Sequence, residues 1–199
     1  MERFLRSTEI INWSHPDVRH RARMLADGAN DPLEISKRCF EWVRDEIRHT
    51  WDYQLKPITC TASEALRAGT GYCYAKSHLL AALLRANAIP AGLCYQRLSR
   101  DGNGPPYCLH GLNALYLPQI GWYRVDARGN RAGIDAQFTS PREQLAFPIA
   151  LQGEADLPEV WPDPLPVVIE ALMAHDTSEG LYENLPDILL WEKREVNRR

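Results

Sequence analysis

The chain contains five cysteines, and one of them has the surroundings that a nucleophilic thiol needs. Cys73 begins a segment, 73–86, whose alanines and leucines predict a long buried helix. The free backbone N–H groups and the positive dipole end of a helix stabilise a thiolate and can also hold an oxyanion. Gly71, two residues earlier, allows a sharp turn and close approach of a substrate. Cys39 and Cys94 lie among apolar residues and are expected to be core thiols.

A thiolate enzyme needs a base and a group that orients the base, and a predicted hairpin offers both. His110 lies near the start of one strand-like run, 109–117, and Asp126 ends the next, 122–126. With a turn between the runs, the two residues are expected nearly opposite each other. Both numbers are even, so the side chains share a face, with β-carbons about 4.5–5.5 Å apart. A slip of one residue would send them to opposite faces. The competing interpretation is a solvent-exposed His and Asp on an ordinary hairpin.

The elements that must position these residues can be read from periodicity and from helix-start signals. Ser14-His15-Pro16-Asp17 and Asn30-Asp31-Pro32 are typical of helix starts. Residues 50–60 are expected to form a loop, and the polar end, 192–199, is expected to fray. The expected helices are 16–27, 30–48, 61–66, 73–86, 167–174 and 178–184, and the expected strands are 91–98, 109–117 and 122–126.

Four segments, in order, resemble the core of the transglutaminase-like superfamily. They lie within residues 16–140 and read WVRDEIRHTWD, GTGYCYAKSHLLAALLRANAIPAG, LHGLNALYL and GWYRVDARGN. That family has a Gly-x-Cys at a helix start, a His at the head of one strand and an Asp at the end of the next. The resemblance implies an α+β, papain-like fold, in which N-terminal helices and a central buried helix pack on an antiparallel sheet. It also implies that Cys73, His110 and Asp126 meet in a cleft.

The resemblance also suggests how the chain is organised. We expect residues 1–145 to form the transglutaminase-like catalytic domain. Residues 146–199 are proline-rich and helical in places, and are expected to pack on the same domain as an extension. After His110 the chain lacks the Trp and the acidic residue that many members carry, which affects the substrate pocket and not the triad.

Residues around the predicted triad are candidates for contact with substrate. A second oxyanion donor is expected from the segment before Cys73. The candidates for oxyanion or substrate binding are Trp51, Tyr53, Gln54 and Gly71. His49 stands where the family commonly has an aromatic residue, and His49 and Asp52 either line the cleft or, as we prefer, are polar residues at a helix end. Arg128 and Asn130 either touch substrate or, as we prefer, anchor their loop.

These features predict a cysteine-dependent acyl-transfer enzyme that acts on an amide or peptide bond through a thioester. Hydrolysis, as in a protease or amidase, is expected over cross-linking, because water is always available and no dedicated amine site is evident. The alternatives are transamidation, as in a transglutaminase, and a non-catalytic binding module on the same fold. The expected partner is a peptide, protein or small amide substrate.

Composition limits the compartment and the partners. The formal net charge of −3 argues against nucleic acid or an anionic membrane as the main partner. The opening residues, MERFLRSTEIINW, carry charges where a signal peptide has an apolar run, and no apolar stretch approaches the length of a membrane helix. We therefore expect a cytoplasmic protein with free thiols.

A metal site is the remaining alternative for the cysteines. Cys108 and His110, with Cys60 and Cys73, could supply zinc ligands, but their spacing fits no familiar paired-ligand signature. No glycine-rich phosphate loop is evident either. The sequence thus predicts neither a metal nor a cofactor.

Overall fold

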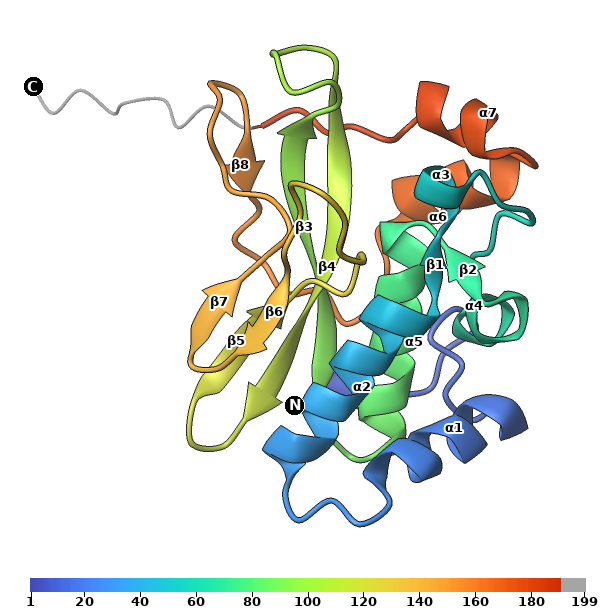
Figure 1. Ribbon diagram of the computed structural model, residues 1–199, viewed down its shortest axis with the longest axis vertical. Coiled ribbons are helices and arrows are strands. Elements are labelled where there is room, and N and C mark those ends of the chain that lie inside the picture. Colours follow the sequence, from blue (N-terminus) through green and yellow to red (C-terminus); the bar gives the residue numbers. More distant parts are fainter. Residues whose placement is uncertain (191–199) are drawn as a thin grey trace, which may run out of the picture.

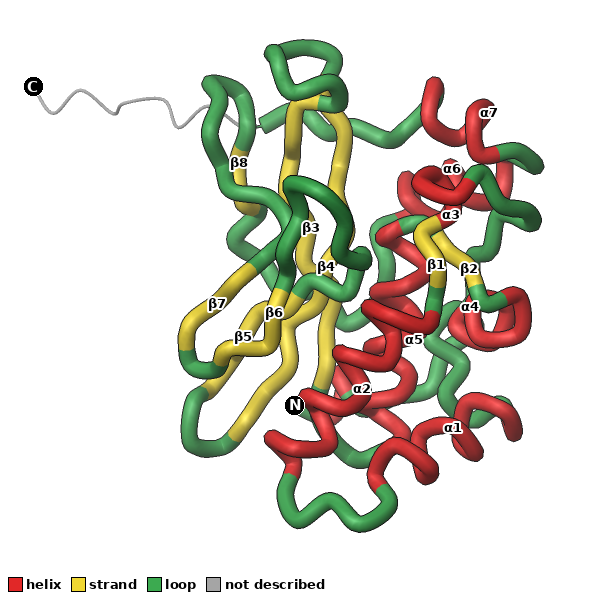
Figure 2. Tube along the Cα trace, in the orientation of Figure 1, coloured by secondary structure: helices red, strands yellow, loops and turns green. Residues whose placement is uncertain are grey.

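The computed structural model describes residues 1–190, which form a helical half and a sheet half. Figures 1 and 2 show α5 between the other N-terminal helices and the long strands β3 and β4. This arrangement confirms the mixed class expected from the sequence, with helices packed on an antiparallel sheet. The helices are η1 (Glu2–Phe4), α1 (Pro16–Ala26), α2 (Pro32–Glu46), α3 (Thr50–Tyr53), α4 (Ala62–Ala68), α5 (Cys73–Ala86), α6 (Pro166–Ala174) and α7 (Ser178–Glu183). The strands are β1 (Arg48–His49), β2 (Thr70–Gly71), β3 (Ala91–Ser99), β4 (Tyr107–Leu117), β5 (Gly121–Val125), β6 (Gln137–Thr139), β7 (Arg142–Gln144) and β8 (Ala155–Asp156).

The central helix α5 is buried along almost its whole length. Every residue from Cys73 to Arg85 is buried, because α1, α2 and α4 cover one side of the helix and β3 and β4 cover the other. A helix that is apolar all round is expected in such a place. Its buried charged side chains find backbone carbonyls: Arg85 donates to Ala91 and Pro162, and Lys76 donates to Ile47. The predicted bounds of this helix are confirmed.

Local capping explains where the N-terminal helices begin. The His15 ring accepts a hydrogen bond from the Asp17 backbone N–H at 3.3 Å, and the Asp31 carboxylate accepts one from Glu34 at 2.8 Å. A proline stands in the first turn of each helix, where its missing N–H costs nothing. Both predicted helix starts are therefore confirmed.

The main sheet has the order β5-β4-β3-β8 and is antiparallel throughout. In the β4–β5 hairpin the last pair toward the site is Asn113 with Val125. Continuing this register sets Asp126 level with Leu112, two residues from His110. The expectation that His110 and Asp126 lie nearly opposite each other is thus right, with an offset of two residues. The expectation of a shared face is right, because a shift of two residues preserves the side of the sheet.

The segment expected to be a loop, residues 50–60, begins with the short helix α3. Gln54 adopts a left-handed conformation, with φ of 50°, and ends the helix after one turn. A single turn is too short to give a periodic pattern, which is why the sequence did not predict it. Before α3, β1 pairs in parallel with β2, and His49 lies level with Gly71. This pairing brings the start of α3 to the N-terminus of α5.

The C-terminal part runs along both the sheet and the helices. β8 pairs with β3, and α7 contacts α3 (Figure 1). Beyond α7 the chain passes β4, where the Leu109 N–H donates to the Pro186 carbonyl at 2.7 Å. The end expected to fray, 192–199, lies outside the described residues.

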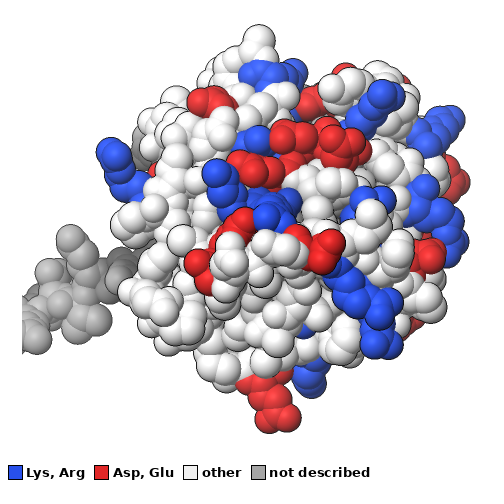
Figure 3. All heavy atoms as spheres, turned by 60° about the horizontal axis from the view of Figure 1, so that its bottom comes forward, with Lys and Arg blue, Asp and Glu red and all other residues white. Residues whose placement is uncertain are grey.

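Charged side chains on the surface are mixed in sign. Figure 3 shows basic and acidic side chains next to each other across the face that it presents. Several of them form ion pairs, among them Arg124 with Glu143 at 2.8 Å and Arg124 with Asp156 at 2.7 Å. In the part of the chain that the structure describes, no helix has the length and apolar character needed to span a bilayer.

Candidate active site

Cys73 is the first residue of α5, and its sulfur faces β4. Tyr72, the residue before it, is extended and places no side chain over the helix end, so the first-turn N–H groups are not capped by it. The Cys73 sulfur lies 3.5 Å from the Gly111 nitrogen, which donates to it. The thiol is 7% exposed. Cys73 thus stands at a helix N-terminus, as the sequence predicted.

His110 lies on β4 beside this sulfur, with its ring held from behind. Its Nε2 is 2.7 Å from Oδ2 of Asp126, which leaves Nδ1 for Cys73. Burial alone lowers the pKa of His110, but the negative charges of Asp126 and Cys73 outweigh it and raise the pKa to about 10. The raised pKa favours the imidazolium form of the ring, which the carboxylate of Asp126 stabilises.

Asp126 follows β5 directly and is completely buried. Its Oδ1 accepts a hydrogen bond from the Arg128 backbone N–H, and its Oδ2 accepts one from Ala146, both at 3.1 Å. Burial raises the pKa of Asp126, but the charge of His110, the hydrogen bond with His110 and these two backbone hydrogen bonds lower it further than burial raises it. The carboxylate is thus fixed, charged and aimed at the His110 ring.

Close packing sets the spacing between the helix and the strand. A β-carbon on Gly111 would lie 2.8 Å from the ring of Tyr74 and 3.3 Å from its α-carbon. Only glycine lets β4 approach the first turn of α5 this closely. The Phe147 ring stands edge-on to the His110 ring, with the two ring centres 5.0 Å apart. The imidazole is therefore held in orientation by its surroundings as well as by Asp126.

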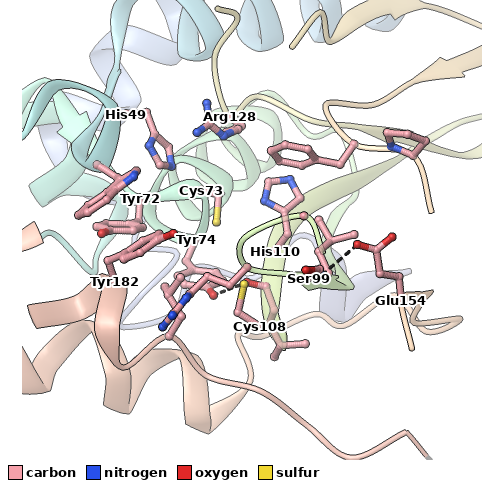
Figure 4. Close-up of a pocket in the computed structure, with 18 of the residues that line it drawn as sticks. His49, Tyr72, Cys73, Tyr74, Ser99, Cys108, His110, Arg128, Glu154 and Tyr182 are labelled. Atoms are coloured by element: carbon pink, nitrogen blue, oxygen red, sulfur yellow. Dashed lines mark hydrogen bonds between the residues drawn. The ribbon is translucent and has the colours of Figure 1, made fainter. Parts of the chain in front are cut away.

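The Cys73 and His110 side chains line a cleft of about 450 Å³. Figure 4 shows Cys73 between the rings of His49 and His110, with Tyr182 and Cys108 farther along the cleft. One wall is aromatic, because Trp51 stacks on Tyr182 with ring centres 3.9 Å apart and planes 5° from parallel. A cleft of this size could hold a peptide segment or a small amide.

Of the four oxyanion or substrate candidates, only Trp51 lines the cleft. Tyr53 is 59% exposed and lies under the guanidinium of Arg48. Gln54 bonds the Trp51 carbonyl and the Ser178 hydroxyl. Gly71 is buried beneath α5, where a β-carbon would lie 3.0 Å from that of Ala75. Gly71 thus allows close packing of α5. The expectation that Gly71 makes room for a substrate is wrong.

The preferred interpretation as polar residues at a helix end is wrong for His49 and right for Asp52, which lies in α3 and does not line the cleft. His49 is buried in the cleft wall, and Asp52 holds the Arg128 guanidinium through two bonds of 2.6 and 2.9 Å. Arg128 therefore reaches the cleft as well as anchoring its loop. Asn130 does anchor the loop, since its side chain accepts from the Ala136 N–H at 2.7 Å. No sequence signal separated these roles, because each depends on a partner far along the chain.

The other cysteines are suited to structural roles. Burial raises the pKa of Cys39, Cys60, Cys94 and Cys108 to about 12, and neighbouring carboxylates or thiols act in the same direction at Cys60 and Cys108. Cys108 nonetheless lines the cleft. Within residues 1–190, no group of three or more His, Cys, Asp and Glu side chains could hold a metal ion, so the zinc set considered from the sequence is not assembled.

Comparisons with known proteins give a family and a fold. A sequence model of the transglutaminase-like superfamily matches residues 19–127, more than half of the chain. The chain is similar in structure to a protein from Cytophaga hutchinsonii described as a "putative cysteine protease", with a TM-score of 0.50 and 19% identity over 63% of this chain and 40% of that one. It is also similar to the periplasmic domain of TgpA from Pseudomonas aeruginosa, with a TM-score of 0.46 and 23% identity over 62% of this chain and 45% of that one. Less than half of each of those two chains is matched. A search of curated proteins finds no match.

Proposed function

The chain belongs to the transglutaminase-like superfamily, and we propose that it is a cysteine-dependent acyl-transfer enzyme that acts on an amide or peptide bond. In this proposal Cys73 is the nucleophile, His110 the general acid and base, and Asp126 the residue that orients His110. The observation that supports the proposal is the 2.7 Å bond between Asp126 and His110, behind a sulfur at a helix N-terminus in an open cleft.

The first half-reaction acylates the thiol. The Cys73 thiolate attacks the carbonyl carbon, and the π pair of the C=O bond moves onto oxygen. When the tetrahedral intermediate collapses, the C–N bond breaks and the imidazolium of His110 gives its proton to the leaving amine. The product is a thioester on Cys73, and His110 is left neutral.

The second half-reaction releases the acyl group. Neutral His110 takes a proton from an incoming water, whose oxygen attacks the thioester carbon and expels the thiolate. The acid product leaves, and the charged Cys73–His110 pair is restored. An amine in place of water would give transamidation. We propose hydrolysis as the main outcome, because water reaches any open cleft without a dedicated binding site.

A substrate panel with matched variants tests the proposal. Peptide amides, small esters and glutaminyl peptides are each incubated with the wild type and with Cys73→Ala, with and without an added primary amine. We expect release of the free acid by the wild type and none by the variant, which should retain the wild-type circular dichroism spectrum. Amine incorporation exceeding acid release would identify a transamidase. Turnover that persists in Cys73→Ala would disprove the proposal.

We also propose that the protein acts in the cytoplasm on peptide, protein or small amide substrates. The five cysteines are all free, which suits a reducing compartment. Fractionation of cells that produce the chain with a C-terminal tag tests this location. Recovery of the tagged protein outside the cytoplasm would contradict it.

A further inference from the structure

His49 lies in the cleft wall beside the N-terminus of α5. The pairing of β1 with β2 sets His49 level with Gly71, so its backbone runs beside the turn that leads to Cys73. Its ring centre is 5.3 Å from that of Tyr72, and the side chain is 6% exposed. Figure 4 shows Cys73 between the rings of His49 and His110. His49 therefore faces the thiol from the side opposite the base.

One nitrogen of the His49 ring is left without a hydrogen bond by the part of the chain that the structure describes. Its Nδ1 is buried and has no hydrogen-bond partner among residues 1–190. The nearby carboxylate of Asp52 is 3.7 Å from Nδ1, too far for a hydrogen bond, and both its oxygens accept from Arg128. Native structures rarely leave a buried polar side-chain atom without a partner. The unpaired Nδ1 in a cleft wall therefore indicates a group with a role in binding or catalysis.

The environment of His49 keeps the ring neutral and favours negative charge nearby. Burial holds the pKa of His49 well below its ordinary value, and nearby cationic groups act in the same direction. A neutral imidazole carries one N–H, which it can donate without losing the proton. The same cations make this wall favourable for an oxyanion. The cationic groups, in order of effect, are Arg128, Lys76, His110 and Arg131.

We propose that His49 donates a hydrogen bond to the oxyanion that forms when Cys73 attacks a carbonyl carbon. The proposal rests on the proposed acyl-transfer function. As the S–C bond forms, the π pair of the carbonyl moves onto its oxygen, on the side of the thiol away from His110. There the oxygen lies between the first-turn N–H groups of α5 and the His49 ring. On collapse the C=O bond re-forms and the leaving group takes its proton from His110, so His49 keeps its own proton throughout.

Trp51 is the competing donor, because it lines the same wall. Its ring is stacked face to face on Tyr182, which makes it part of the aromatic wall. His49, by contrast, comes from the strand that pairs beside the Cys73 turn and has a buried nitrogen to which no residue of the described chain, 1–190, bonds. The observations therefore favour His49.

Two reactions of Cys73, compared in the same variants, test the proposal. Acylation by p-nitrophenyl acetate passes through a tetrahedral oxyanion, whereas alkylation by iodoacetamide is a displacement at a saturated carbon and forms none. His49→Phe keeps the ring but removes the donor, and His49→Gln supplies an amide donor. We expect His49→Phe to slow acylation about 100-fold and His49→Gln to recover about 10-fold of that loss. Alkylation of Cys73 should stay within about 3-fold of the wild-type rate in both variants.

Other outcomes would overturn the proposal. An unchanged rate of Cys73 acylation in His49→Phe would show that His49 does not stabilise the oxyanion. An equal fall of acylation and alkylation in both variants shows that His49 only supports the Cys73–His110 pair. A loss in Trp51→Phe without a loss in His49→Phe assigns the oxyanion to the indole. Failure of the acyl-transfer function itself is distinct, because then wild-type Cys73 would react with either reagent no faster than Cys108.

Discussion

The His110 ring lies between a buried carboxylate and a sulfur, and both charges favour its protonated form. Asp126 has no freedom to move, since it accepts hydrogen bonds from the Arg128 and Ala146 backbone as well as from His110. A fixed charge stabilises an imidazolium without reorganisation as the reaction proceeds. Asp126 does not touch substrate in the proposed mechanism, but it thus controls the protonation of His110, which does.

Replacing Asp126 by asparagine tests this control. Asp126→Asn removes the charge that raises the pKa of His110 but leaves the ring buried, and burial lowers that pKa. We expect the pKa to fall from about 10 toward or below its ordinary value. Turnover should fall about 10⁴-fold, as for a triad whose Asp is replaced by Asn. NMR titration of the labelled ring and a turnover assay give the two readings.

The exposed Asp45 provides a matched control for this substitution. Asp45 forms an ion pair with Arg44 outside the cleft. Asp45→Asn should therefore leave both the pKa of His110 and the turnover rate unchanged. A His110 titration curve that is the same in Asp126→Asn and the wild type would contradict the assigned cause.

At the scale of elements, α5 fixes the position of the segments around it. Lys76, one turn into the helix, donates from its Nζ to the carbonyls of Ile47 and Arg44, at the end of α2. Ile47 directly precedes β1, so this contact also fixes the position of His49, which lines the cleft. Burial lowers the pKa of the Lys76 amine to about 7, because an ammonium loses its hydration there.

This buried amine predicts a pH-dependent stability. The folded pKa of about 7 lies below the ordinary lysine value of 10.5, so between these values the unfolded chain binds more protons than the folded one. Wild-type stability should therefore rise relative to Lys76→Met as the pH goes from 7 toward 10, by at most about 1.4 kcal/mol per pH unit. Below pH 7 the difference should be constant. Urea unfolding of both proteins across this pH range measures the difference in their free energies of unfolding.

Lys37 serves as the control for the lysine experiment. Its side chain is 53% exposed and pairs with Glu41 on the surface of α2. Urea unfolding of Lys37→Met should follow the wild type across the pH range. A Lys76→Met curve that also stays parallel to the wild type would show that the amine is charged in the fold at all these pH values.

At the scale of the whole molecule, the far wall of the cleft comes from outside the part of the chain that matches the family. That match ends at residue 127, whereas Phe147, Tyr182 and Leu185 line the cleft. The last part of the described chain is tied to the sheet by a two-bond pair between Arg97 and Asp187, at 2.7 and 2.6 Å. The segment beyond the part that matches the family therefore shapes the space in which a substrate side chain would lie.

Truncating the aromatic wall should affect binding more than chemistry. Tyr182→Ala removes the stack on Trp51, whereas Tyr182→Phe keeps the stack and loses only the bond to Asp101. For the best substrate of the panel, we expect the alanine variant to raise KM about 10-fold, a loss of about 1.4 kcal/mol, with little change in kcat. The phenylalanine variant should stay close to the wild type. Equal effects of the two variants would mean that the stack contributes nothing.

Much of the fold and the centre of the site follow from short-range patterns. Pro16 and Asp31 mark helix starts because they satisfy, or do not need, the free N–H groups there. The position of Cys73 at a helix start and the shared face of His110 and Asp126 follow from the periods of the helix and the strand. These features need only neighbours in the sequence, so the sequence by itself determined them.

Tertiary structure decided the rest of the site. The register offset between His110 and Asp126, the inward position of His49 and the outward one of Tyr53 depend on which distant segments pack together. His49 faces the cleft because β1 pairs with β2, and Tyr182 reaches Trp51 because α7 packs on α3. Hydrogen bonding and burial between segments far apart in the chain have no period in the sequence, so only the folded chain reveals which side chains surround the thiol.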